Sequence, residues 1–138
     1  EPSHHIVHLY NYVGQPWRTQ EIVDEVLHTL YFNNPDGLSG NEDCGQMSAW
    51  YILNAMGFYQ VCPGKPVYSI GRPLFNEATV HLKDGKSFKV IAHNNSRDNK
   101  YVRSIVLNGN KLETPFFTHQ DIVDGGTLEL TMGSEPLK

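Results

Sequence analysis

The sequence predicts an α+β chain in which helices come first and antiparallel strands follow. Helical periodicity dominates before residue 57, prolines and glycines gather over residues 63–73, and short strand-like runs follow from residue 79. Helices followed by hairpins along the chain are typical of α+β architectures. We therefore expect the second part to form a small β-sandwich or a single sheet layer.

Two helices are predicted before the turn-rich segment 33–40. Ser3 can cap the first, over residues 4–12, and Thr19 can cap the second. The second helix carries an apolar stripe with helical spacing, formed by Val23, Val26, Leu27 and Leu30. Asparagine, proline and glycine in the segment after it favour turns over helix.

A third helix is predicted over residues 45–56, with Gly57 as its end. It is apolar almost all round, so we expect it to be buried inside something larger. Glu42 and Asp43 precede it in a polar loop. Aspartate is a preferred N-cap, and carboxylates are stabilised by the positive end of a helix dipole.

Strand-like runs occupy residues 79–82, 87–92, 104–107 and 127–132. Asp84-Gly85 and Asn108-Gly109 lie beside these runs and are strong hairpin signals. The segment 63–73 is interpreted as a linker because five of its residues are proline or glycine.

Length and charge exclude several classes of function. A chain of 138 residues can form one domain or two small ones, and its net charge of −4 disfavours a nucleic-acid or anionic-membrane partner. No apolar run approaches the roughly 20 residues that span a bilayer. Because the first residue is Glu1 rather than methionine, we expect the sequence to be a piece of a longer protein.

Cys44 and Cys62 flank the third helix. A helix of about 12 residues spans about 18 Å, which is too far for a disulfide without a turn back. We therefore expect two buried free thiols. A nucleophilic Cys44 near a helix N-terminus is an alternative, but it requires a histidine partner that the spacing does not identify.

Histidines and aromatic residues suggest two further alternatives. His4 and His8 are one helical turn apart, which is the spacing of a zinc helix, yet such spacings arise easily among ordinary helix histidines. Six aromatic residues could line a sugar platform or belong to the core, namely Tyr10, Tyr12, Trp17, Trp50, Tyr51 and Phe58.

The acidic loop before the third helix suggests hydrolysis. A carboxylate at the mouth of a helical scaffold can act as general base towards water. Cleavage of a glycosidic bond uses two carboxyl groups, one as acid and one as nucleophile or base. Composition alone leaves this as one interpretation among several.

Several motifs together resemble the glycoside hydrolase family 92 α-mannosidases. The most specific is GNEDCGQMSAWY at residues 40–51, followed by AMGFY at 55–59 and VCPG at 61–64. The opening residues 1–5, the Tyr10-Asn11-Tyr12 segment and the runs at 72–75, 94–96, 107–109 and 125–133 also resemble the family. The resemblance covers essentially the whole chain.

This resemblance implies a fold and an activity. Residues 1–62 would be the last helices of an (α/α)6 catalytic domain, and residues 63–138 a C-terminal β-rich segment. The family's enzymes are calcium-dependent and hydrolyse terminal α-linked mannose with inversion. The general acid would lie in the upstream portion of the same polypeptide, so the isolated chain would be inactive.

The resemblance also assigns residues. Asp43 would be the general base and Glu1 would help to hold Ca²⁺. Asn41, Glu42 and Gln46 would contact the mannose-containing glycan, although Glu42 is also interpreted as a supporting group. Some members of the family carry a second aspartate at the position of Asn41.

By resemblance, we expect the parent to be secreted, periplasmic or displayed on a bacterial cell surface, with no membrane span. The competing hypothesis is a non-catalytic carbohydrate-binding or structural β module with a helical N-terminal extension. A third helix that needs covering partners favours the enzyme, because a binding module has no use for such a helix.

Overall fold

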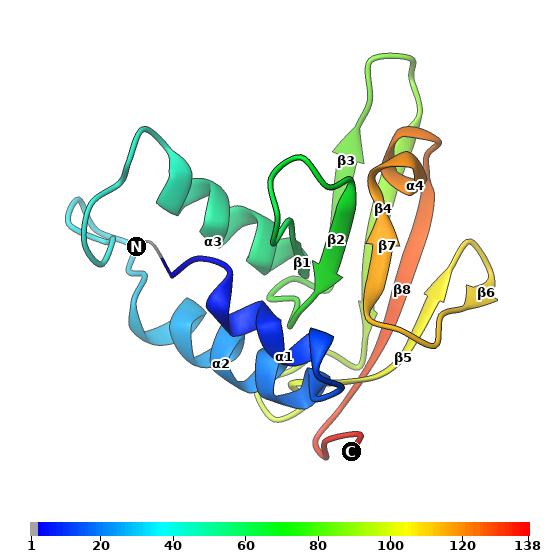
Figure 1. Cartoon of the computed structure of the whole chain (residues 1–138), viewed down its shortest axis with the longest axis horizontal. Coiled ribbons are helices and arrows are strands. Elements are labelled where there is room, and N and C mark those ends of the chain that lie inside the picture. Colours follow the sequence, from blue (N-terminus) through cyan, green and yellow to red (C-terminus); the bar gives the residue numbers. More distant parts are fainter. Residues whose placement is uncertain (1–2) are drawn as a thin grey trace.

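The computed structural model describes residues 3–138, and it confirms the α+β class. The N-terminal helices lie on one side of the molecule and the strands on the other (Figure 1). Glu1 and Pro2 lie outside the described residues. No helix in residues 3–138 is long and apolar enough to cross a membrane.

The first two helices differ from the sequence prediction in their starts. A 3-10 turn, Ile6–His8, leads into a short helix α1, Leu9–Tyr12, in place of one continuous helix. Helix α2 spans Pro16–Thr29, so Pro16 begins this helix instead of ending the one before it. Proline suits the first helical position because its missing N–H has no partner there. The predicted cap, Thr19, is wrong: it lies buried within α2.

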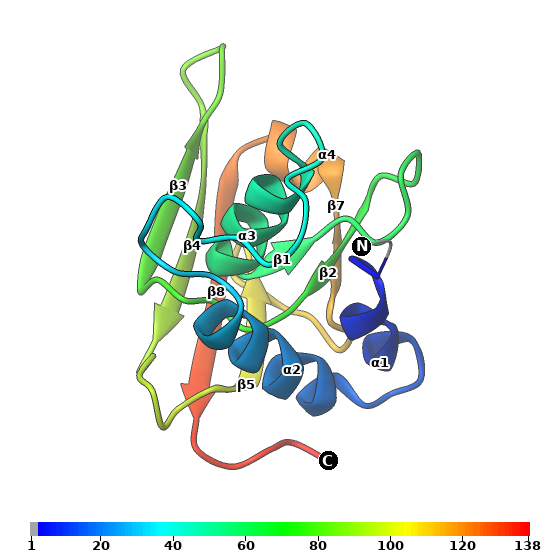
Figure 2. The ribbon, with the colours of Figure 1, turned by 90° about the vertical axis from the view of Figure 1, so that its left-hand side faces the viewer.

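Helix α3 spans Gln46–Met56 and ends at Gly57, as predicted. Gly57 has φ 108°, a conformation that glycine adopts without steric cost at a helix C-terminus. The helix is only partly covered, because Trp50, Asn54 and Ala55 are buried whereas Ile52 is 56% exposed. Viewed from the side, α3 lies in front of the strands and above α2 (Figure 2).

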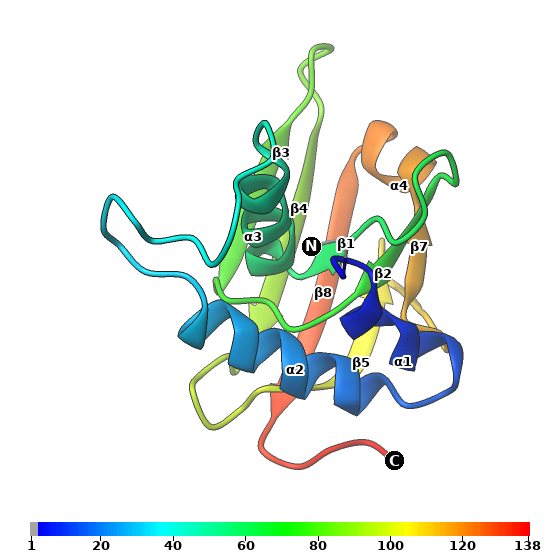
Figure 3. The ribbon, with the colours of Figure 1, turned by 60° about the vertical axis from the view of Figure 1, so that its left-hand side comes forward.

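The strands form two sheets. The first is antiparallel, with the order β1 (Phe58–Tyr59), β2 (Val67–Ile70), β7 (Phe116–Thr118). The second has the order β3 (Glu77–His81), β4 (Ser87–His93), β8 (Gly126–Gly133), β5 (Tyr101–Leu107), β6 (Asn110–Lys111). A short helix α4, His119–Val123, connects β7 to β8, which pairs in parallel with β4 (Figure 3).

Both predicted hairpins are present. The Asp84-Gly85 turn joins β3 to β4, and the Asn108-Gly109 turn joins β5 to β6. Asn108 and Gly109 both have positive φ, 50° and 81°, as a type I′ turn requires. The four predicted runs correspond to β3, β4, β5 and β8, whereas the shorter strands β1, β2, β6 and β7 and helix α4 were not predicted.

The segment 63–73 is not a loose linker. It contains β2, and Ser69, Ile70, Gly71, Arg72 and Pro73 are all buried. The charged Arg72 can be buried in this stretch because Asp24 of α2 forms an ion pair with its guanidinium at 3.0 Å. The division of the chain at residues 62 and 63 into two domains stays a prediction.

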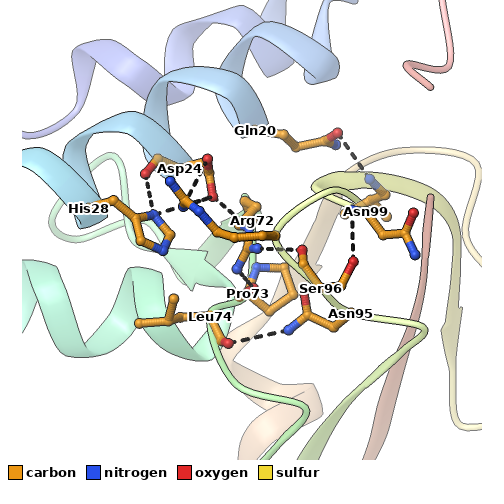
Figure 4. A network of polar contacts seen from close by, with 11 residues as sticks. Gln20, Asp24, His28, Arg72, Pro73, Leu74, Asn95, Ser96 and Asn99 are labelled. Carbon is orange, nitrogen blue, oxygen red and sulfur yellow. Dashed lines mark hydrogen bonds and ion pairs between the residues drawn. The ribbon is translucent and has the colours of Figure 1, made fainter. Parts of the chain in front are cut away.

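The Asp24–Arg72 pair belongs to a polar cluster that ties α2 to two loops (Figure 4). The Arg72 guanidinium donates to the Ser96 carbonyl at 3.0 Å, and Asn95 donates its amide to the Leu74 carbonyl at 3.3 Å. Two segments that resemble the family in sequence, 72–75 and 94–96, therefore contact each other, and their polar side chains hold the fold together.

Two apolar clusters make up the core. The larger lies between the sheets and includes buried residues from both, such as Phe58, Ile70, Phe88, Phe117, Leu128 and Leu130. Leu53 and Met56 of α3 pack against it. The smaller cluster joins α2 to α3 through Val23, Leu27 and Trp50. Helix α3 thus contacts both clusters, and its N-terminal end projects away from the sheets (Figure 1).

Candidate functional site

An open hollow of about 480 Å³ lies at the N-terminal end of α3. One wall comes from the N-terminal segment and another from the loop before α3 with its first turn. A third wall comes from β1 and the residues after it. The lining residues are His4, His5, Asp43, Gln46, Tyr59, Gln60, Val61 and Pro63.

Asp43 reaches this hollow through an unusual loop. Asp43, Cys44 and Gly45 have φ values of 53°, 56° and 96°, so three successive residues adopt the left-handed region. Aspartate tolerates this conformation better than most residues, but a cysteine rarely adopts it. Such backbone strain gathers at functional sites, and here it places an exposed carboxylate at the mouth of the hollow.

The N-cap interpretation of Asp43 is wrong. The N-cap residue is Gly45, without a side-chain cap hydrogen bond. Instead, the Glu42 carboxylate accepts from the Ser48 backbone N–H at 3.3 Å and from its hydroxyl at 3.0 Å. The Asp43 carboxylate is thereby left free of the helix end.

The other predicted site residues separate into two groups. Gln46 lines the hollow beside Asp43, whereas Asn41 and Glu42 are not among its lining residues. Asn41 is exposed on the loop, and Glu42 is half-buried against α3. Glu1, the predicted calcium ligand, lies outside the described residues. Tyr59 and Gln60 line the hollow without any sequence spacing that could have predicted it.

The N-terminal wall is held by α3. The Trp50 indole N–H donates to the His4 carbonyl at 2.8 Å, and His4 Nε2 lies 3.0 Å from the Met47 sulfur. The pKa of His4 is lowered, mainly because burial disfavours the charged ring. This residue therefore presents a neutral imidazole to the hollow at neutral pH.

His8 does not act as a metal ligand in this fold. Its ring is fully buried, with Nδ1 3.0 Å from the Ser69 hydroxyl and Nε2 2.8 Å from the Asn54 side-chain oxygen. The Asn54 oxygen can only accept, so Nε2 donates to it, and Nδ1 of the neutral ring accepts from the Ser69 hydroxyl. Both ring nitrogens are thus engaged, which removes His8 from the zinc alternative.

The prediction of buried thiols is wrong. Cys44 and Cys62 are both free, as expected, but both are exposed. Cys44 lies in the surface loop before α3, and Cys62 lies in the surface loop after β1. No apolar layer covers either thiol. The hydrogen bonds of residues 3–138 give Cys44 no histidine partner of the kind a thiolate nucleophile needs.

Calcium fits the chemistry of this hollow only in part. The Asp43 carboxylate and the Gln46 amide offer oxygen donors, which Ca²⁺ prefers, but Ca²⁺ takes about six to eight of them. Within residues 3–138 no group of three or more acidic, histidine or cysteine side chains could hold a metal ion. A complete calcium shell would need further ligands from outside the described residues.

The hollow has the composition of one half of a hydrolytic site. A carboxylate that faces an open, partly polar hollow can accept a proton from water. Asp43 is the one carboxylate among the described lining residues, so a reaction that uses two carboxyl groups needs its second from elsewhere.

Comparison with known proteins is consistent with a hydrolytic site that lies only partly within this chain. The model of the glycosyl hydrolase family 92 catalytic domain matches residues 1–134. A curated relative, an uncharacterized secreted glycosidase from Arthroderma benhamiae, is 30% identical in an alignment of 138 positions that covers 98% of this chain.

Two solved structures from Bacteroides thetaiotaomicron are similar over nearly the whole chain. A family 92 α-mannosidase in complex with mannoimidazole matches with a TM-score of 0.94 and 43% identity over 99% of this chain. A family 92 inverting mannosidase matches with a TM-score of 0.91 and 47% identity over 99% of this chain. The chain spans 18% of the length of each of these two enzymes and of the Arthroderma relative.

Proposed function

The chain belongs to glycosyl hydrolase family 92, and from this membership we propose that a longer protein containing it, the parent polypeptide, hydrolyses terminal α-linked mannose from glycans. The observation that carries the proposal is the Asp43 carboxylate at the mouth of the hollow. Membership of a catalytic-domain family favours the hydrolase over a non-catalytic carbohydrate-binding module.

In this proposal Asp43 acts as general base. Its carboxylate takes a proton from the water that attacks the anomeric carbon, while an acid from the upstream polypeptide protonates the departing oxygen. An inverting pair stands about 6.5–9.5 Å apart so that the water fits between the carboxyl group and the sugar. The open side of the hollow leaves room for the missing half of the site.

Gln46 is proposed to contact the sugar directly, because it lines the hollow from the first position of α3. Asn41 lies in the same loop as Asp43 and is exposed, so it can reach a sugar bound by the parent polypeptide. Glu42 has a supporting role: its bonds to Ser48 fix the loop that carries Asp43.

Calcium is proposed as the cofactor of the parent polypeptide. Bound beside the hollow, it would orient the sugar through its hydroxyl groups. Glu1, whose structure is not described, would supply one ligand, and the rest would come from the upstream chain. The similarity to a secreted glycosidase supports a parent that is exported, displayed on the cell surface or held in a bacterial periplasm.

Replacement of one carboxylate tests the proposal. We expect Asp43→Asn in the parent polypeptide to lower the turnover of α-mannosides at least about 100-fold, because the amide cannot accept the proton from water. Mannose release gives the rate, and proton NMR of the first product identifies the β-anomer that inversion yields.

The matched control is Asp36→Asn, which makes the same chemical change on the exposed loop before the motif and does not touch the hollow. This variant should keep wild-type turnover. If Asp43→Asn retains wild-type turnover as well, Asp43 has no part in the mechanism.

A further inference from the structure

Two of the three walls of the hollow, the N-terminal segment and the loop before α3 with its first turn, come from distant parts of the sequence. His4 and His5 belong to the N-terminal segment, whereas Asp43 and Gln46 lie about 40 residues later. Their separation sets where a sugar between them meets the base. Any contact that joins the walls therefore bears on catalysis if the proposed function is correct.

Helix α3 makes two such contacts from a single face. Met47 and Trp50 are three residues apart and so lie on the same side of the helix. The Trp50 indole N–H donates to the His4 backbone carbonyl at 2.8 Å, and the Met47 sulfur lies 3.0 Å from His4 Nε2. The first bond is made to the His4 backbone, so it positions the N-terminal segment whatever the orientation of the His4 ring.

Trp50 is itself held rigidly. Its side chain is 4% exposed and stacks on Tyr31 with ring centroids 5.9 Å apart and planes within 3°. The Tyr31 hydroxyl donates to the Met47 carbonyl at 3.1 Å, and burial raises the pKa of Tyr31 to about 12, so this donor persists at neutral pH. Tyr59, which lines the hollow, also packs against the indole, with ring centroids 6.3 Å apart and planes tilted by 55°.

We propose that Trp50 is a positioning residue for the hydrolysis: its indole N–H clamps the N-terminal segment to α3 and fixes the distance between the two walls of the hollow. The proposal rests on the proposed function, because positioning matters only if Asp43 acts on a sugar held there. Trp50 does not itself line the hollow, so it acts through His4 and the backbone around it.

The test replaces the indole by a ring that cannot donate. In the parent polypeptide, Trp50→Phe keeps an aromatic ring but removes the bond to His4. We expect kcat to fall at least about tenfold with KM changed less than about threefold, because a sugar misplaced relative to the base loses transition-state contacts more than ground-state binding. Hydrogen exchange at the Ile6 and His8 amides, which donate to Ser3 and His5, should quicken about fivefold to tenfold.

Trp17→Phe is the matched control, because Trp17 lies on α2 outside the hollow. It should leave kcat and the exchange of both amides unchanged. Met47→Leu conserves volume and removes the sulfur contact alone, so it tests the same coupling if Trp50→Phe fails to fold. It should quicken the same exchange without loss of thermal stability.

Two results separate this proposal from the proposed function. An active wild type whose Trp50→Phe variant keeps both its kcat and its amide exchange would overturn the positioning role and leave the hydrolase intact. A wild type that releases no mannose would overturn the proposed function and with it the catalytic part of this inference. The amide exchange would then decide whether Trp50 couples the two walls.

Discussion

At the scale of single residues, environment decides what each ionisable group does. Glu42 and Asp43 are adjacent carboxylates, yet one bonds to Ser48 and the other faces a hollow. The left-handed backbone at Asp43 turns the two side chains in different directions. His4 and His8 differ in the same way, since His4 lines the hollow whereas His8 is sealed in the core.

The buried His8 makes stability depend on pH. Burial lowers the pKa of His8 to about 4, while its Asn54 hydrogen bond opposes the shift. The unfolded chain, with a histidine pKa near 6.5, binds more protons than the folded chain between pH 6.5 and pH 4. Stability is therefore fully present above about pH 6.5 and is lost as the pH falls towards 4, by about 3 kcal/mol in total.

Urea unfolding of the chain at a series of pH values measures this effect. The wild type should lose stability between pH 6.5 and 4, and His8→Gln, which cannot titrate, should show a flatter profile from a lower starting value. His5→Gln, at an exposed histidine, should retain the wild-type slope. Equal slopes for His8→Gln and the wild type would show that another group causes the loss.

At the scale of elements, the β5–β6 hairpin is locked to the start of β8. The Asn108 side-chain oxygen accepts from the Thr127 backbone N–H at 2.8 Å. Gly126, the first residue of β8, has φ 134°, and a Cβ there would lie 2.1 Å from that same oxygen. The hairpin therefore needs glycine at 126 both for its backbone conformation and for the space beside Asn108.

Gly126→Ala should destabilise the chain by about 1–3 kcal/mol, because it combines a strained backbone with loss of the Asn108–Thr127 bond. Gly109→Ala is the matched control: its φ is also positive, at 81°, but a Cβ there meets nothing within 4 Å. Thermal unfolding followed by circular dichroism should rank Gly126→Ala clearly below Gly109→Ala. The reverse order would show that the clash at Asn108 is relieved without cost.

At the scale of the whole molecule, the chain holds only part of the chemistry that its family performs. The hollow is open, and its described residues supply one carboxylate and too few oxygen ligands for calcium. Ile52 of α3 and Phe32 of the preceding loop are 56% and 58% exposed. The upstream portion of the parent polypeptide is the partner we propose for the open side.

Removal of metal tests the proposed cofactor in the parent polypeptide. Excess calcium chelator should abolish mannose release, and calcium should restore it. Without the cation, the negatively charged oxygen ligands of such a site repel one another and no longer orient the sugar. Magnesium should restore mannose release poorly, since Mg²⁺ demands a smaller octahedral shell. Full activity in excess chelator, with the metal content of the protein checked separately, would remove calcium from the proposal.

Much of the fold could be predicted from local pattern. The stop of α3 at Gly57 and the four longer strands followed from turn chemistry and alternation. The strands β1 and β2 did not, because β1 has two residues and β2 has four within a proline-rich stretch, too few for a period to show. Ser69 and Arg72 are buried there only because Asn11, His8 and Asp24, all more than 45 residues away, satisfy them.

The candidate site divides in the same way. Asp43 and Gln46 were identified from the motif at residues 40–51, whereas the roles of His4, Tyr59 and Trp50 around the hollow depend on contacts between distant segments. The exposed state of Cys44 and Cys62 likewise could not be read from their spacing.

The sequence by itself determined the order of helices and strands, the hairpin turns and the family, because these are written in spacings of a few residues and in one long motif. The tertiary structure alone decided which side chains share the hollow, that Glu42 supports the loop while Asp43 faces the open space, and that Trp50 joins its walls. The contacts that join the two walls link residues more than 40 positions apart, and no local periodicity records which distant partners a fold brings together.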